Sequence, residues 1–230
     1  GLKGVIAAET HLSSVDGLAG ELIIGGFALE ELAGEASFEE VVYLLWHGDL
    51  PDETQLVSFR TALAERRVLP EACLMLLKEA ANQQASVIDA LKMAVGTLSL
   101  EGQGDSEDEA MTVVASFPSI VAAYWRLVNG QDPVAPRSDL GHAANYLYML
   151  TGQVADEASV RALETYLNTV VDHGLNASTF TARVIISTRS DLISAVVGAI
   201  GALKGPLHGG APGPALDMVF EIGKVENAEP

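Results

Sequence analysis

Two segments in the second half of the chain each place a histidine beside glycine at an expected helix end. The first runs from Val171 to Arg183 and reads Val-Asp-His-Gly-Leu-Asn-Ala-Ser-Thr-Phe-Thr-Ala-Arg, so that His173 precedes Gly174. The second reads Leu-Lys-Gly-Pro-Leu-His-Gly-Gly-Ala and has His208 near its centre. Imidazole can carry charge, donate a hydrogen bond or transfer a proton near neutral pH. These two histidines are therefore the first candidates for catalysis.

A predicted helix over residues 157–172 would end beside His173, with Gly174 as its left-handed cap. The partial negative charge of a helix C-terminus favours the imidazolium form, which suits the binding of a dicarboxylate. Asn176 and Ser178 follow closely and could supply neutral hydrogen-bonding groups. The segment thus predicts an anion-binding site.

His208 has the opposite predicted setting, because it precedes a helix expected over 215–222, with Pro214 in its first turn. The partial positive charge of a helix N-terminus favours neutral imidazole. A neutral imidazole can polarise a carbonyl oxygen by donating a hydrogen bond, as a neutral histidine does in triosephosphate isomerase. Gly209 and Gly210 allow close backbone approach. The pattern predicts anion binding at one histidine and enolisation at the other.

Structural explanations for both segments stay open at this point. A histidine beside a helix-ending glycine is more often part of a cap, and a glycine- and proline-rich turn often serves packing alone. His11, His47 and His142 show no metal-ligand spacing, so we expect structural roles for them and predict no metal site. Neither glycine-rich segment matches a nucleotide-binding pattern.

Composition limits the classes of function. A net charge of −18 with only 13 Lys and Arg argues against nucleic acid as a partner. The 49% of hydrophobic residues can build a substantial core, yet no run of 18 apolar residues predicts a membrane span. Cys73 is the only cysteine, and residues 1–4 lack the features of a signal peptide. We therefore expect a reducing, cytoplasmic location.

The predicted elements are mostly helical, so that the chain is expected to be one all-α domain with a minor β element. Residues 2–27 favour short extended pieces with turns at 16–17 and 25–26. Ser37 and Glu40 fit a capping box, and Pro51 is expected to open the next helix. An acidic loop is expected over 101–109. The further helices are expected from Pro70, over 86–100, over 109–128 with Pro118 inside it, and over 138–151, 157–172, 191–203 and 215–222.

Ordered matches to one known family run through nearly the whole chain, beside the two histidine segments. They are Gly1-Leu2-Lys3-Gly4-Val5, Glu9-Thr10, Asp16-Gly17, Glu30-Glu31-Leu32-Ala33, Ser37-Phe38-Glu39-Glu40, Leu44-Leu45, Gly48-Asp49-Leu50-Pro51, residues 142–149, Ser190-Asp191 and Ser194-Ala195. In these motifs the chain resembles the citrate synthase family, which condenses an acyl-CoA with a 2-oxo acid. The resemblance implies a citrate synthase-like large-domain helical bundle over residues 1–230.

The resemblance also implies roles for the site residues. His173 matches the family histidine that holds oxaloacetate, and His208 matches the one that hydrogen-bonds the thioester carbonyl as the acetyl group becomes an enol. Asn176, Ser178 and Gly209 complete the expected substrate site. The implied substrates are oxaloacetate and an acyl-CoA, the implied assembly is at least a homodimer, and no cofactor is implied beyond the coenzyme A thioester itself.

Some family features have no counterpart in this sequence. The Gly-His-Arg-Val-Tyr motif, the Asp-Pro-Arg that follows it, the aspartate base and further substrate-binding arginines are absent, so the chain is expected to be truncated on the C-terminal side. Pro212 and Gly25 stand where many members have asparagine and arginine, which suggests a divergent paralogue. Acetyl-CoA and propionyl-CoA stay open as substrates. So does a catalytically incomplete paralogue that acts as a helical interaction or regulatory subunit.

Overall fold

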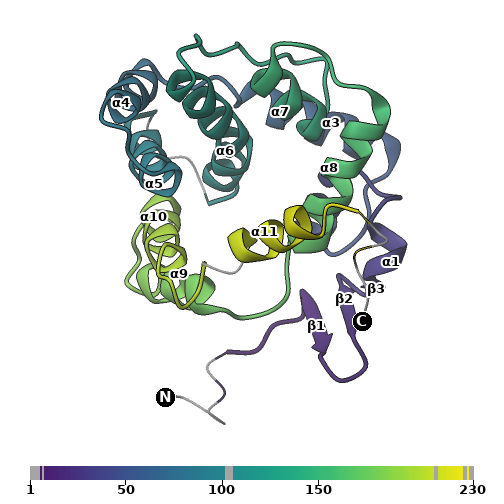
Figure 1. Cartoon of the computed structure of the whole chain (residues 1–230). Helices are drawn as coiled ribbons and strands as arrows, with labels where there is room; N and C mark the ends of the chain where they lie inside the picture. The colour runs from purple at the N-terminus through teal and green to yellow at the C-terminus, as the bar shows by residue number, and fades with distance from the viewer. Residues whose placement is uncertain (1–5, 7, 102–105, 210–211, 225–226, 228–230) are drawn as a thin grey trace. The chain divides into compact units, whose positions relative to one another are not determined.

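The structure is a computed structural model that describes residue 6 and residues 8–101, 106–209, 212–224 and 227 (Figure 1). Contacts within the chain divide it into two compact units, Gly1–Leu175 and Asn176–Pro230. The sequence analysis did not predict this division, because no linker or change of composition marks it. Each unit is described by itself below.

The first unit begins with a small antiparallel sheet of three strands in the order β1-β2-β3. The strands are β1 (Ser13–Asp16), β2 (Glu21–Ile24) and β3 (Phe27–Ala28), with Ser13 opposite Ile24. The predicted extended pieces are confirmed over 13–16 and 21–24, as are both turns, while residues 2–5 and 7 lie outside the described residues. Gly25 has a φ of +56°, and a Cβ there would lie 2.8 Å from the Leu44 side chain, so this turn requires glycine.

Helices make up the rest of the chain, and the all-α class with a minor N-terminal β element is confirmed. The helices of the first unit are α1 (Leu29–Leu32), α2 (Phe38–His47), α3 (Glu53–Glu65), α4 (Glu71–Asn82), α5 (Val87–Thr97) followed by the 3-10 helix Leu98–Glu101, α6 (Ser106–Val128), α7 (His142–Thr151) and α8 (Glu157–Val170). Those of the second unit are α9 (Ala177–Ser187), α10 (Leu192–Leu203) and α11 (Pro212–Ile222).

The capping box at the start of α2 is confirmed. The Ser37 hydroxyl accepts from the Glu40 amide, and the Glu40 carboxylate accepts from the Ser37 amide at 2.8 Å. The prediction that Pro51 opens the next helix is wrong by two residues. Asp52 caps α3 instead by accepting from the Gln55 amide at 2.8 Å, which satisfies a free donor of the first turn.

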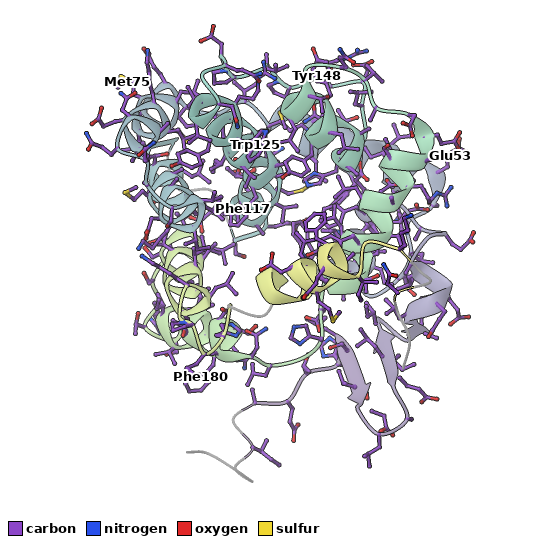
Figure 2. The ribbon with its side chains drawn as sticks, in the orientation of Figure 1. Glu53, Met75, Phe117, Trp125, Tyr148 and Phe180 are labelled. Carbon is purple, nitrogen blue, oxygen red and sulfur yellow. The ribbon has the colours of Figure 1, made fainter. Side chains whose placement is uncertain are left out.

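Helix α6 is central to the first unit, where it packs against α3, α4, α5 and α7 (Figure 1). The neighbouring α4 buries Leu77 and turns Met75, which is 62% exposed, to the outside (Figure 2). Among the described residues, α6 is the one helix that is long and apolar enough to cross a membrane. Half of its most apolar stretch of 18 residues is buried inside the protein. Packing on four helices accounts for that apolar character.

Several predicted boundaries are wrong. The acidic residues Glu107, Asp108 and Glu109 form the first turn of α6 rather than a loop, where their charge suits the helix N-terminus; residues 102–105 of that predicted loop lie outside the described residues. Helix α7 begins at 142 rather than 138, α8 ends at 170 rather than 172, and α11 begins at 212 rather than 215. Helix α9 was not predicted at all.

Candidate active site

His173 lies in the turn that follows α8 in the first unit. The helix ends at Val170 with Val171 as its cap residue, so His173 is not in the last helical turn. Gly174 has the predicted left-handed conformation, with a φ of +88°, but within this turn rather than as the helix cap. The influence of a helix dipole falls off within the last turn. The prediction that His173 lies at the C-terminus of the helix is therefore wrong. The side chain of His173 is exposed.

The turn around His173 is held by the side chain that precedes it. Asp172 Oδ1 accepts a hydrogen bond from the Gly174 amide at 3.0 Å, which closes a local turn. The same oxygen accepts from the hydroxyl of Ser13 on β1, 159 residues away in the sequence. The position of His173 thus depends on contacts that sequence reasoning did not find.

Asn176 opens the second unit as the N-cap of α9. Its side-chain oxygen accepts from the Thr179 amide at 2.9 Å and from the Thr179 hydroxyl at 3.2 Å. This role commits the amide oxygen of Asn176 to the helix start. The amide nitrogen is the part of this side chain that can still donate to a ligand.

Ser178 and His208 are brought together by the fold of the second unit. Ser178 lies in the first turn of α9, and its hydroxyl oxygen is 2.7 Å from Nε2 of His208. His208 lies in the turn after α10, four residues before α11 begins, so it precedes a helix as predicted; residues 210 and 211 between them lie outside the described residues. The distance is that of a good hydrogen bond, and each residue fixes the rotamer of the other.

Gly209 is required by the close approach of the backbone in the same turn. Its amide donates to the carbonyl of Gly205 at 3.1 Å, and a Cβ at this position would lie 1.9 Å from the carbonyl oxygen of Leu203. No side chain can occupy that space without movement of the backbone. The structure thus provides the physical basis of the close approach that the sequence predicted; Gly210, which was expected to share in it, lies outside the described residues.

The frame for this turn is the hairpin of α9 and α10, which pack along each other. At their contact, a Cβ on Gly198 would lie 2.3 Å from Ile185 Cδ1. Asp191 caps α10 by accepting from the Ser194 amide at 2.7 Å. Small side chains at the contact and a capped start fix the two helices together, and with them Ser178 and the chain that leads to His208.

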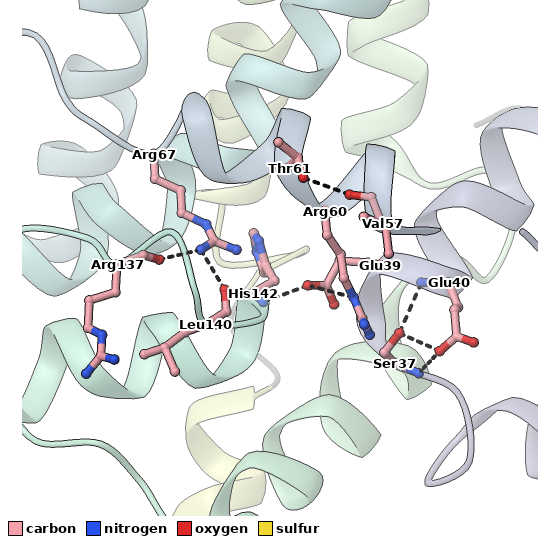
Figure 3. Close-up of polar contacts among 10 residues, drawn as sticks. All are labelled: Ser37, Glu39, Glu40, Val57, Arg60, Thr61, Arg67, Arg137, Leu140 and His142. Carbon is pink, nitrogen blue, oxygen red and sulfur yellow. Dashed lines mark hydrogen bonds and ion pairs between the residues drawn. The ribbon is translucent and has the colours of Figure 1, made fainter. Parts of the chain in front are cut away.

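A buried polar network in the first unit was missed by sequence reasoning (Figure 3). Glu39 is fully buried, and its Oε1 accepts from the backbone amide of His142 at 2.8 Å and lies 3.8 Å from Nε of Arg60. The other oxygen, Oε2, has no hydrogen-bond partner. Glu39 thus joins the start of α2 to the start of α7. The capping pattern at 37–40 gave no sign of this, because the contact spans 103 residues.

Arg67 forms the second half of the network and is 1% exposed. Its Nη1 donates to the backbone carbonyls of Arg137 and Leu140, both at 2.8 Å (Figure 3). Asn145 Oδ1 accepts from the amide of Arg137. Burial lowers the pKa of Arg67, and the charge of Glu39 opposes that shift. These bonds hold the connection between α6 and α7 in place. Their geometry indicates a structural role.

His142 is a buried core histidine, in keeping with the structural role expected for it. Its ring stacks on Phe38 with centroids 4.6 Å apart and lines an apolar cavity of about 350 Å³ beside α6. Within the described residues, no three His, Cys, Asp or Glu side chains come together as metal ligands. The polar network and the candidate catalytic residues Ser178 and His208 belong to different units of the chain.

The burial of His142 predicts a pH dependence of stability. Desolvation, with a smaller contribution from the charge of Arg67, lowers the pKa of His142 from 6.5 to about 3. The unfolded chain therefore binds one proton more than the folded chain between these values. This contribution to stability is complete above pH 6.5 and is lost as the pH falls toward 3, by up to roughly 1.4 kcal/mol per pH unit.

Urea unfolding of the wild type and of His142→Gln between pH 4.5 and 7 checks this expectation. The carboxylates titrate in both proteins, so the difference between the two curves isolates the histidine. We expect the free energy of unfolding to fall more steeply in the wild type as the pH decreases. Parallel curves would contradict the assigned burial of a neutral imidazole.

Comparison with known proteins agrees with this fold over the whole chain. A family profile described as "Citrate synthase, C-terminal domain" matches residues 1–230. The citrate synthase of Haloferax volcanii is 44% identical over 232 residues, 96% of this chain and 61% of that protein. A 2-methylcitrate synthase of Mycobacterium tuberculosis is 39% identical, over 99% of this chain and 59% of its own length.

Structural similarity leads to the same family. The solved ternary complex of Thermoplasma acidophilum citrate synthase with carboxymethyl coenzyme A and oxaloacetate superposes with a TM-score of 0.87 at 27% identity, covering 96% of this chain and 60% of that one. The fold is that of an all-α protein. The chain belongs to the citrate synthase family. It spans about three fifths of the length of these relatives.

Proposed function

We propose that this chain forms the part of a citrate synthase-type enzyme that binds oxaloacetate and polarises the thioester of acetyl-CoA. The observation that carries the proposal is the contact of 2.7 Å between Ser178 Oγ and His208 Nε2, in a turn that only glycine at 209 allows. A histidine held in this way can direct its other nitrogen at a carbonyl oxygen. Membership of the citrate synthase family supplies the reaction class.

In the proposed reaction, a base removes a proton from the acetyl methyl group and the thioester carbonyl becomes an enol. The enol carbon then attacks the keto carbon of oxaloacetate, and water cleaves the resulting citryl thioester to citrate and coenzyme A. His208 contributes as the hydrogen-bond donor to the thioester oxygen. If Ser178 donates its hydroxyl proton to Nε2, the remaining proton of neutral imidazole is on Nδ1, where it can serve as that donor.

His173 is the proposed ligand of an oxaloacetate carboxylate. Its imidazole is exposed in the first unit and forms no hydrogen bond with any of the residues described, so it can receive a ligand. The nitrogen of Asn176 is a second proposed donor, one that the capping bond leaves available. Both groups were expected from the sequence, and both keep a donor for substrate.

The distribution of charge supports anion binding more in one unit than in the other. Residues 1–175 contain nine Lys and Arg against 26 Asp and Glu, whereas residues 176–230 contain four against five. Nearly all of the net negative charge therefore belongs to the first unit. The second unit by itself therefore contributes little repulsion of an anionic acyl-CoA.

Two alternative functions are compatible with membership of the citrate synthase family. Propionyl-CoA in place of acetyl-CoA is supported by the similarity to a protein named 2-methylcitrate synthase. A non-catalytic helical subunit is the alternative if the chain binds neither substrate. We further propose a cytoplasmic homodimer that needs no cofactor beyond the thioester. Light scattering tests the assembly, and undiminished turnover after dialysis against a chelator tests the cofactor.

Calorimetric titration of the protein with oxaloacetate, followed by an assay of coenzyme A release from acetyl-CoA and propionyl-CoA, tests the proposal. We expect binding that His173→Ala abolishes and, in a full-length enzyme that supplies the base absent from this chain, release of coenzyme A that depends on both substrates. The faster of the two thioesters identifies the acyl group. Absence of both binding and release would overturn the enzymatic proposal in favour of the subunit.

A further inference from the structure

One carboxylate oxygen links the N-terminal sheet to the turn that carries His173. Oδ1 of Asp172 accepts from the Ser13 hydroxyl on β1 and, at 3.0 Å, from the Gly174 amide on the far side of His173. Ser13 and Asp172 are both half-buried, whereas the intervening His173 is exposed. The histidine is thus flanked by residues tied to a single atom. That oxygen is held in turn by its hydrogen bond to Ser13, which lies on a strand near the start of the chain.

The strand that provides this anchor is itself well held. Ser13 pairs with Ile24 across β1 and β2, and Ile24 is fully buried in a cluster with Leu32, Val41 and Leu44. Val171, the residue before Asp172, packs against the same cluster. Two successive residues before His173 are therefore attached to one core, one by apolar contact and one by a hydrogen bond.

The end of α8 has a further attachment to the same region. The side-chain nitrogen of Asn168, which is fully buried, donates to the carbonyl of Ala36 at 2.8 Å, just before α2 begins. Beyond the histidine, Gly174 takes a φ of +88° that favours glycine. The backbone on both sides of His173 is thus constrained, although the imidazole itself forms no hydrogen bond, ion pair or ring contact with the described residues.

We propose that Ser13 and Asp172 are a positioning pair that fixes the direction of His173 toward its anionic ligand. An exposed imidazole without a partner of its own is directed by its backbone alone, so a loose turn would spread the ring over many orientations. Holding the turn before the ligand arrives lowers the entropy lost on binding. The small sheet then serves as the support of the site, through contacts 159 residues apart. This inference rests on the proposed oxaloacetate-binding role of His173.

A graded set of variants tests the pair in the full chain. Asp172→Ala removes both hydrogen bonds, and Ser13→Ala removes one. Asp172→Asn keeps an acceptor oxygen at the same place, and Ser13→Thr keeps the hydroxyl. Ser14→Ala is the matched control, because Ser14 is exposed on the same strand and lies next in sequence. Each protein is assayed for hydrogen exchange of the Gly174 amide, for the spread of the His173 ring resonances by NMR, and for oxaloacetate affinity.

We expect exchange of the Gly174 amide to be faster by roughly tenfold or more in Asp172→Ala, since that variant loses the acceptor of this proton. Oxaloacetate affinity should fall by about tenfold in Asp172→Ala, by a few-fold in Ser13→Ala, and remain within twofold of the wild type in the two conservative variants and the control. The unfolding midpoint of Ser13→Ala should stay close to that of Ser14→Ala. This separates loss of position from loss of the fold.

The measurements distinguish failure of the pair from failure of the proposed function. If the wild type binds no oxaloacetate, the ligand assignment falls, while the amide and ring resonances still report on the turn. Unchanged resonances and exchange in both Asp172→Ala and Ser13→Ala would overturn the positioning pair even in a protein that binds oxaloacetate. Loss of affinity in Ser14→Ala equal to that in Ser13→Ala would overturn it as well, because the effect would then belong to the strand as a whole.

Discussion

Alanine in place of Gly209 is expected to destabilise the second unit by about 3 kcal/mol. The new Cβ would lie 1.9 Å from the carbonyl oxygen of Leu203 and 3.0 Å from its carbonyl carbon. These are backbone atoms at the end of α10, so a side-chain rotation cannot relieve the overlap. The turn must move, at the cost that is typical of overpacked sites.

The matched control is Gly201→Ala, in α10 of the same unit. A Cβ there has no atom within 4 Å, so the substitution adds helix propensity without overlap. It should stabilise the helix by roughly 0.5–1 kcal/mol. Urea unfolding of both variants provides the comparison. Equal free energies of unfolding for the two would show that the turn tolerates a side chain at 209 and that its glycine has no packing role.

Movement of this turn should also separate His208 from Ser178. Both His208 and Gly209 donate their amides to the carbonyl of Gly205, at 2.9 and 3.1 Å, so that the histidine and the glycine share one hydrogen-bonded turn. A displaced Gly209 therefore displaces the imidazole. Stability and catalysis are expected to fall together in Gly209→Ala, whereas Gly201→Ala should leave turnover unchanged.

Local sequence signals predicted most of the framework correctly. The capping box at Ser37, the turn glycines of the N-terminal sheet and Pro70 at the start of α4 all depend on residues a few positions apart. Such signals lie entirely within the segment whose structure they determine.

Helix α9 was missed because its own residues argue weakly for a helix. Its sequence, Ala-Ser-Thr-Phe-Thr-Ala-Arg-Val-Ile-Ile-Ser, is rich in β-branched side chains, which have low helix propensity. Packing along α10, with Gly198 against Ile185, stabilises it from outside. One local signal was present, because asparagine at position 176 is a favourable N-cap residue. From the sequence, Asn176 was expected only as a hydrogen-bond donor to a ligand.

The contacts that position the candidate site were beyond prediction from local patterns. Ser13 meets Asp172 and Glu39 meets His142 across 159 and 103 residues, and neither pair is marked by spacing or composition. From the sequence and its family resemblance, His173, Ser178 and His208 were expected as residues of the site. The structure added how Ser178 and His208 face each other. It also placed His173 beyond the last turn of α8, where the sequence had not placed it.

In a full-length enzyme that contains this chain and supplies the base absent from it, replacement of His208 by alanine is expected to lower kcat for citrate formation by about 10²–10⁴-fold, the usual contribution of a positioned proton donor. The affinity for oxaloacetate should be unchanged, because that substrate is assigned to His173. Ser178→Ala should have a smaller effect, of roughly tenfold, since His208 stays in place but loses the bond at Nε2 that selects its tautomer. Steady-state release of coenzyme A measures both.

His47→Ala is the control for loss of a histidine as such. The ring of His47 lies against that of Tyr43 in the first unit, with centroids 4.1 Å apart and the planes tilted by 43°, and His47 has no proposed part in the reaction. It should keep near wild-type kcat. Because Ser178 acts only through His208, the double variant His208→Ala with Ser178→Ala should be no slower than His208→Ala alone. Wild-type turnover in His208→Ala would refute the donor role, and additive losses in the double variant would show that Ser178 acts on the substrate by itself.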